Sequence, residues 1–194
     1  MGNLYYFPVE FWALQYGLAH FVETGTEFGE AVGIAARAPF RTLWTIEIDP
    51  LMAAGARRRF ADDPRVRVLV GDSTTQLPVA LAGMDGAPAM FWLDAHYPKI
   101  PGDWTTLPLP VELDVVSTYP GLAQSIVLVD DRHIYEDDWV EAGPFPEDSH
   151  VRDLETQPLK AMEARWAATH RALRSPVQEG YAAFVPLAWD VEAI

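Results

Sequence analysis

Met90-Phe-Trp-Leu-Asp94 is one of five short apolar runs in this chain that close on a small or acidic residue. The other four are Phe21-Val-Glu-Thr-Gly25, Leu43-Trp-Thr-Ile-Glu-Ile-Asp49, Val66-Arg-Val-Leu-Val-Gly-Asp72 and Ile126-Val-Leu-Val-Asp-Asp131. Between successive runs the chain is long enough to hold a crossover helix, which is what a parallel sheet covered on both faces requires. The sequence therefore predicts an α/β fold with a doubly wound, Rossmann-like sheet that contains five parallel strands.

The same runs indicate where a site lies. In an open parallel sheet, ligands bind beyond the carboxyl ends of the strands. An acid stands at or near the end of each run, and the five are Glu23, Glu47, Asp72, Asp94 and Asp130. We therefore expect these acids to line one binding site.

The size and charge of the chain narrow the classes of function. Its 194 residues fit one domain, and its formal charge of −14 argues against a nucleic-acid partner, because Lys and Arg supply that affinity. The sequence has no cysteine, so it offers no thiol nucleophile and no zinc–thiolate site. No stretch predicts a membrane span, and the start of the chain is a poor signal peptide. These features favour a cytoplasmic protein that does not bind membranes.

We expect a single domain over residues 1–194, with a cofactor-binding core at 21–131. The segments between the apolar runs predict helices at roughly 28–38, 51–61, 74–83 and 108–118. Residues 1–20 precede this core as an N-terminal helical segment.

Within the N-terminal segment, residues 9–20 can form a short helix on which Phe11, Leu14 and Leu18 share a face. Such a helix either packs on the sheet or acts as a lid over the site. The sequence leaves both roles open.

The segment 132–194 breaks the strand–helix alternation. It predicts a loop over the site, a helix at 156–168, and an antiparallel hairpin that pairs 170–177 with 181–187. This hairpin is expected to close the sheet.

The first run continues into the turn Glu23-Thr-Gly25-Thr-Glu27-Phe-Gly29, which opens a helix. Glycines at 25 and 29 allow a sharp turn and a close approach of the backbone to a ligand. A dinucleotide-binding turn would rest a pyrophosphate on the helix amides, and the carboxylate of Glu27 would repel that group. The turn therefore favours a ligand that lacks phosphate and carries a cationic centre.

Two later positions suit the parts of a nucleoside. Glu47 lies near the end of the second strand, where a carboxylate can accept two hydrogen bonds from a ribose diol. Asp72 and Ser73 follow the third strand and can hydrogen-bond an adenine edge, although such a pair is also a common turn former.

As a set, these motifs resemble those of the class I S-adenosylmethionine (SAM)-dependent methyltransferases. The resemblance covers about residues 21–131 and rests on Glu23-x-Gly25, Thr45-Ile-Glu47-Ile-Asp49-Pro50, Val70-Gly71-Asp72-Ser73, Leu93-Asp94-Ala95-His96 and Val129-Asp130-Asp131. Within that class the chain looks most like the metal-dependent small-molecule O-methyltransferases of the catechol and macrolide-sugar types. Each motif is common alone, and the series is specific only as a set.

The resemblance implies that six residues bind the cofactor, namely Glu23, Gly25, Thr26, Glu47, Asp72 and Ser73. The first three would hold the methionine part of SAM. The fourth would hold the ribose, and the last two would contact the adenine.

The resemblance also implies a divalent metal. In that family the metal is held by an acid at the end of strand four and an acidic pair at the end of strand five, which match Asp94, Asp130 and Asp131 here. Three converging carboxylates would in any case repel one another unless a hard cation such as Mg²⁺, Mn²⁺ or Ca²⁺ lay between them.

The catalytic base is the point at which this chain departs from the family pattern. Catechol-type enzymes place a lysine three residues beyond the strand-four acid, where this chain has Tyr97. His96, Lys99 and His133 are close enough in sequence to serve beside Asp94, and a histidine titrates in the useful range. The sequence leaves this choice open.

The predicted activity is SAM-dependent, metal-assisted O-methyl transfer to a small molecule with adjacent oxygens. A homodimer is an assembly that the sequence permits. Two alternatives stay open. One is a SAM-binding module without catalysis that serves interaction or regulation, and the other is a nicotinamide oxidoreductase, which Glu27 disfavours.

Overall fold

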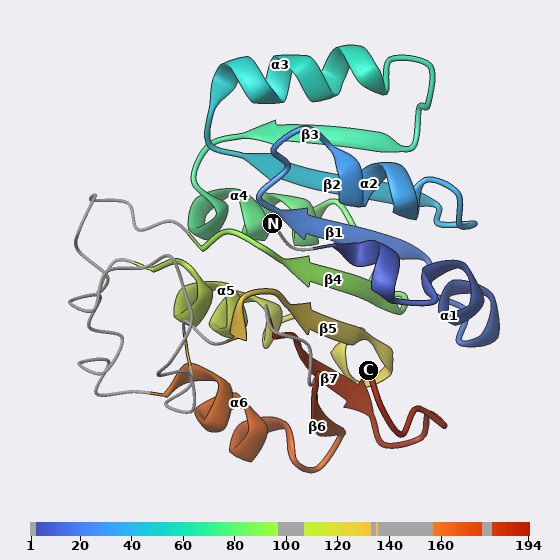
Figure 1. Ribbon diagram of the computed structural model, residues 1–194, viewed down its shortest axis with the longest axis vertical. Coiled ribbons are helices and arrows are strands. Elements are labelled where there is room, and N and C mark those ends of the chain that lie inside the picture. Colours follow the sequence, from blue (N-terminus) through green and yellow to red (C-terminus); the bar gives the residue numbers. More distant parts are fainter. Residues whose placement is uncertain (1–2, 97–106, 133–134, 136–156, 176–179) are drawn as a thin grey trace.

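The computed structural model describes residues 3–96, 107–132, 135, 157–175 and 180–194. Seven strands form one sheet: β1 (His20–Thr24), β2 (Thr42–Glu47), β3 (Val66–Val70), β4 (Ala89–Leu93), β5 (Ile126–Val129), β6 (His170–Arg174) and β7 (Ala182–Pro186). Their order across the sheet is β3-β2-β1-β4-β5-β7-β6 (Figure 1). The first five strands run parallel, and β7 pairs antiparallel with both β5 and β6. The predicted fold class, with five parallel strands and a closing antiparallel hairpin, is confirmed.

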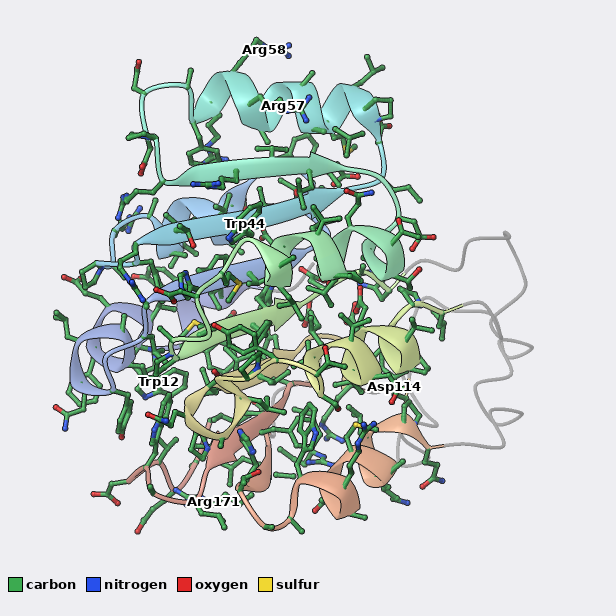
Figure 2. All side chains as sticks on the ribbon, turned by 180° about the vertical axis from the view of Figure 1, so that it is seen from behind. Trp12, Trp44, Arg57, Arg58, Asp114 and Arg171 are labelled. Atoms are coloured by element: carbon green, nitrogen blue, oxygen red, sulfur yellow. The ribbon has the colours of Figure 1, made fainter. Side chains whose placement is uncertain are left out.

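Helices cover both faces of this sheet. In chain order they are η1 (Leu4–Tyr6), α1 (Val9–Gln15), α2 (Glu30–Ala35), α3 (Pro50–Arg59), α4 (Ser73–Ala82), α5 (Leu109–Val116), η3 (Leu122–Gln124) and α6 (Pro158–Trp166). One face carries α1 and α2 (Figure 1). The other face carries α4, α5 and α6, which lie in front of the sheet when the molecule is seen from behind (Figure 2).

The central strands alternate between two buried cores. In β4, Met90 and Trp92 face the core beneath α1 and α2, whereas Phe91 and Leu93 face the core beneath α4 and α5. Because each face of the strand is covered, the strand reads as an unbroken apolar run rather than as an alternating one. This double burial explains why the runs of β1, β2, β4 and β5 were recognisable in the sequence, whereas β3, at the edge of the sheet, is only partly buried.

The N-terminal helix differs from its prediction. Helix α1 ends at Gln15, and Phe11 and Leu14 are 57% and 64% exposed. The helix instead buries Val9, Trp12 and Ala13. The predicted apolar face was wrong because it assumed a helix that continued to Leu18, and the shorter helix turns a different side to the sheet. Of the two roles left open, packing on the sheet is the one that these contacts describe.

The C-terminal hairpin reaches back to the start of the chain. The backbone N–H of Asn3 donates to the hydroxyl of Tyr181, 3.2 Å away, and the side chain of Phe7 packs edge-on against the same ring. The segment before β1 and the segment before β7 therefore meet on one face of the sheet. Among the described helices, none has both the length and the apolar character needed to cross a bilayer.

Candidate active site

The carboxyl ends of β1, β4 and β5 meet at one edge of the sheet. The register pairs Thr24 with Leu93 and Leu93 with Val129. The residues that follow these strands, Gly25, Asp94 and Asp130, are consequently neighbours, as the predicted parallel order requires.

The turn after β1 packs directly against the end of β4. Gly25 has a φ of +82°, and a Cβ built at this position would lie 2.7 Å from the carbonyl oxygen of Asp94. No side chain fits in that gap, and L residues rarely adopt that φ. Glycine at this position therefore lets the predicted cofactor turn touch the residue that begins the acidic cluster.

Glu23 is buried beneath this turn. The hydroxyl of Thr45 donates to its carboxylate at 2.5 Å, and the hydroxyl of Thr26 lies 2.5 Å from that of Thr45. Burial raises the pKa of Glu23 well above its ordinary value, against the opposing effect of the Thr45 hydrogen bond. The structure thus links Glu23 and Thr26, two of the predicted cofactor residues, through a hydroxyl of β2.

Glu47, at the end of β2, organises the backbone around it. Its Oε2 accepts the N–H of Glu27 at 2.7 Å, and its Oε1 accepts the N–H of Asp49 at 2.9 Å. Asp49 in turn caps α3 by accepting the N–H of Leu51 at 2.7 Å. The carboxylate of Glu47 therefore ties the turn after β1 to the turn after β2.

Asp72 and Ser73 lie where α4 begins. Asp72 accepts the backbone N–H and the hydroxyl of Thr74 at 2.8 and 2.7 Å, so it caps the helix in the way that the simpler interpretation of this pair expected. Ser73 is buried. Neither position is in conflict with the predicted adenine contact.

The acidic cluster contains a histidine. Asp94, His96 and Asp131 each offer one ligand atom, and these atoms all lie within 4.8 Å of one another. The Nδ1 atom of His96 lies 3.3 Å from Oδ1 of Asp94 and 3.3 Å from Oδ2 of Asp131. Of the three predicted metal ligands, the structure brings Asp94 and Asp131 into this group and adds His96, which was predicted only as a base.

Asp130 lies beside this group with its carboxyl group buried. Among the described residues, neither of its side-chain oxygens has a hydrogen-bond partner of ordinary geometry, although Asp94 lies close enough to affect it. Burial, together with the charges of Asp94 and Asp131, raises the pKa of Asp130 well above its ordinary value. Four titratable groups are thus crowded where two strands end, and a cation would relieve the repulsion among the three carboxylates.

His96 responds to the same charges. Burial lowers the pKa of its imidazole, but the contact with Asp94 and the negative charges of Asp131 and Asp94 outweigh burial, so the pKa stands above its ordinary value. The carboxylate oxygens of this group suit a hard divalent ion such as Mg²⁺ or Mn²⁺, whereas an imidazole nitrogen is a ligand typical of transition-metal ions. The two other predicted bases, Lys99 and His133, lie outside the described residues.

Sequence reasoning missed Glu112 of α5. Its side chain is fully buried. Within the described ranges, neither carboxyl oxygen has a hydrogen-bond partner of ordinary geometry, although the hydroxyls of Ser73 and Thr24 lie close enough to affect the carboxyl group. Burial raises the pKa of Glu112 to about 7, and the charges of Asp72 and Asp94 act in the same direction. A signal was available in the sequence, because Glu112 falls on the apolar stripe of its own helix, one residue before the buried Leu113.

No protein-family model matches this chain, and no curated protein matches its sequence. Solved structures match its fold. The Podospora anserina methyltransferase PaMTH1, bound to SAH, has a TM-score of 0.62 and 19% identity over 92% of this chain and 76% of that chain. The SAM-bound O-methyltransferase TomG from Streptomyces achromogenes, involved in tomaymycin synthesis, has a TM-score of 0.60 and 21% identity over 92% of this chain and 77% of that one.

A third structure, the 23S rRNA methyltransferase ErmE, has a TM-score of 0.56 and 13% identity over 97% of this chain and 70% of that chain. Identities of this size show a shared fold. The chain therefore has the fold of the class I SAM-dependent methyltransferases, as the resemblance of its motifs implied. TomG is described as an enzyme of tomaymycin synthesis and ErmE as a 23S rRNA methyltransferase. Because one fold serves such different acceptors, the acceptor of this chain has to be argued from its own site.

Proposed function

We propose that this protein transfers a methyl group from SAM to an oxygen of a small molecule, and that a divalent cation assists the transfer. One observation carries the proposal: the glycine turn after β1 touches the backbone of Asp94, the first residue of the Asp94–His96–Asp131 cluster. A cofactor held by that turn and a cation held by that cluster would be neighbours. The class I methyltransferase fold supports the same assignment.

The residues divide into two groups under this proposal. Gly25, Thr26 and Glu47 would bind the methionine and ribose parts of SAM. Glu23 would hold Thr26 in place through the hydroxyl of Thr45, which contacts both side chains. Asp72 and Ser73 would face the adenine. These assignments follow the matched motifs and the hydrogen bonds that join the two turns.

Asp94, Asp131 and His96 would hold the cation, with Asp130 behind them. A divalent cation there supplies positive charge that lowers the pKa of an acceptor hydroxyl. A small molecule with adjacent oxygens, such as a vicinal diol, a catechol or a hydroxy acid, is the acceptor that such a site favours. The strong negative charge of the chain also disfavours a nucleic-acid acceptor.

The chemistry required of the chain is alignment and removal of one proton. The acceptor oxygen forms a bond to the methyl carbon while the bond between that carbon and sulfur breaks, and the acceptor's proton passes to a base. His96 is the candidate base whose surroundings the structure describes, and its ring is fixed between two carboxylates. It would act as the base only where it does not bind the cation, because a neutral imidazole with one nitrogen on a metal carries its proton on the other. Holding the three reacting groups in line is itself a large part of the rate enhancement.

Binding of SAM or its demethylated product is expected to stabilise the protein against heat. At about 100 times its dissociation constant, a ligand adds about 2.7 kcal/mol, which for a domain of this size is roughly 5–10 °C in Tm. NAD is expected to give no shift, because Glu27 opposes its pyrophosphate. A shift with NAD but not with SAM or SAH would overturn the assignment, and a panel of acceptors with labelled SAM and Mg²⁺ then separates turnover from binding alone.

Glu47→Ala is expected to weaken SAM binding about tenfold to a hundredfold, the usual loss for a charge-assisted hydrogen bond. Its carboxylate also holds the N–H groups of Glu27 and Asp49, so we expect a loss of about 1–3 kcal/mol in stability as well. Titration calorimetry on the folded variant measures the first effect. Glu47→Gln is the control for charge, because it keeps one acceptor oxygen. Unchanged SAM affinity in both variants would indicate that Asp49, and not Glu47, contacts the ribose.

A further inference from the structure

Trp92 connects the hydrophobic core to the acidic cluster. Its side chain is completely buried on the α1 and α2 face of the sheet. Its indole N–H nevertheless reaches the end of β4 and donates to Oδ2 of Asp94 over 3.3 Å. A buried indole is therefore the donor to a carboxylate that belongs to the candidate metal group.

This contact gives the two oxygens of Asp94 different surroundings. Oδ2 faces the indole N–H, whereas Oδ1 lies 3.3 Å from Nδ1 of His96. Rotation of the Asp94 carboxylate would move Oδ2 away from the indole N–H. A buried donor without an acceptor raises the free energy of the folded state. The indole thus favours the orientation in which Oδ1 points into the cluster.

The indole itself is fixed by aromatic contacts from both ends of the chain. The ring of Phe7 lies edge-on to it with centroids 5.8 Å apart, and the ring of Tyr181 lies at 5.9 Å. Phe7 and Tyr181 also contact each other at 5.2 Å. A ring held in this way has little freedom to follow a displaced carboxylate.

We propose that Trp92 is a positioning residue for the divalent cation: its N–H holds Asp94 so that Oδ1 is presented to the metal. The inference rests on the proposed function, since it assumes that the Asp94–His96–Asp131 cluster binds a cation. Partners that orient a metal ligand usually contribute about tenfold to a hundredfold in metal affinity. Because the contact is long for a hydrogen bond, we expect the lower end of that range.

Trp44 provides a matched control. It is also a buried tryptophan in the same sheet, on β2 (Figure 2), but its indole nitrogen has no hydrogen-bond partner in the part of the chain that the structure describes. Trp92→Phe and Trp44→Phe both replace a buried indole by a smaller ring. Trp92→Phe alone removes a donor to Asp94.

The test is calorimetric titration of Mn²⁺, and separately of SAM, into the protein and the two variants. We expect Trp92→Phe to raise the Kd for Mn²⁺ roughly tenfold and leave the Kd for SAM unchanged, and Trp44→Phe to alter neither. Equal Mn²⁺ affinity in Trp92→Phe and the unsubstituted protein would overturn the proposal, as would an equal loss in Trp44→Phe. Failure of the unsubstituted protein to bind Mn²⁺ would instead refute the metal site of the proposed function.

A measurement on the unsubstituted protein covers the case in which Trp92→Phe does not fold. With ¹⁵N-labelled tryptophan assigned through the backbone, titration with Mg²⁺ is expected to move the indole resonance of Trp92 and not that of Trp44. A Trp92 resonance that stays in place while Mg²⁺ binds would contradict the proposal.

Discussion

Removal of divalent metal by a chelator is expected to reduce methyl transfer roughly a thousandfold, while the affinity for SAM stays within about twofold. A cation at Asp94 and Asp131 would stabilise charge on the acceptor oxygen by several kcal/mol, and each step of about 1.4 kcal/mol is a factor of ten in rate. The residues assigned to SAM, such as Thr26 and Glu47, make their hydrogen bonds away from this cluster. Excess Mg²⁺ should restore the activity.

Substitutions at the cluster should reproduce the effect of the chelator. Asp94→Asn and Asp131→Asn are expected to abolish the response to Mg²⁺, and Asp130→Asn to lower metal affinity more than cofactor affinity. Asp114→Asn is the matched control, because Asp114 is an exposed acid on α5 whose Oδ1 lies 2.7 Å from Arg165 (Figure 2). If methyl transfer to an identified acceptor is unchanged by the chelator and by the substitutions at Asp94, Asp130 and Asp131, these acids have a structural role and bind no catalytic metal.

Glu112→Gln is expected to stabilise the protein by about 3 kcal/mol above pH 7 and by almost nothing below pH 4.5. The folded protein raises the pKa of Glu112 from 4.5 to about 7, because the carboxyl is buried. Between these values the folded chain holds a proton that the unfolded chain has released. Stability therefore falls as pH rises through this window, and the full penalty is present above pH 7. Glutamine has no proton to lose and carries no such penalty.

Urea denaturation of both proteins between pH 4 and pH 8 measures this difference. Asp130 also has a raised pKa and adds to the pH dependence of each protein, so the difference between the two curves isolates Glu112. Glu163→Gln, at an exposed position paired with Arg174, is the control and should change stability by less than about 0.5 kcal/mol at every pH. A difference between Glu112→Gln and the unsubstituted protein that does not vary with pH would show that the fold does not raise the pKa of Glu112.

The sheet could be predicted from the sequence because a strand that is buried on both faces is an unbroken run of apolar residues. Strands such as Met90–Leu93 contain no polar residue until the acid that follows them, and parallel strands place those acids at one edge. That is why the sequence alone predicts that Asp94 and Asp131 lie close together. The apolar pattern of helix α1 was less informative. A helix of only two turns is compatible with more than one buried face, and the wrong face was predicted.

The parts of the site that were missed depend on contacts between distant segments. Nothing near Trp92 in sequence distinguishes an indole that fills a core from one that also donates to Asp94. Glu112 stood on an apolar stripe, but its neighbours Thr24 and Ser73 come from other elements, and only the packing of α5 against the sheet brings them together. The entry of His96 into the metal group likewise depends on the end of β5, which places Asp131 beside the residues that follow β4.

The position of β7 between β5 and β6 has a consequence for how the chain reaches this structure. The antiparallel strand β7 is synthesised after the five parallel strands, so β5 presents an unpaired edge until Ala182–Pro186 pairs with it. The aromatic contacts of Phe7 are also incomplete until the hairpin has been synthesised, because Tyr181 is one of its partners. Pairings across such long stretches of chain are slow to form. The five parallel strands can therefore pair during synthesis, whereas the contact of Tyr181 with Trp92 forms only after the hairpin has been translated.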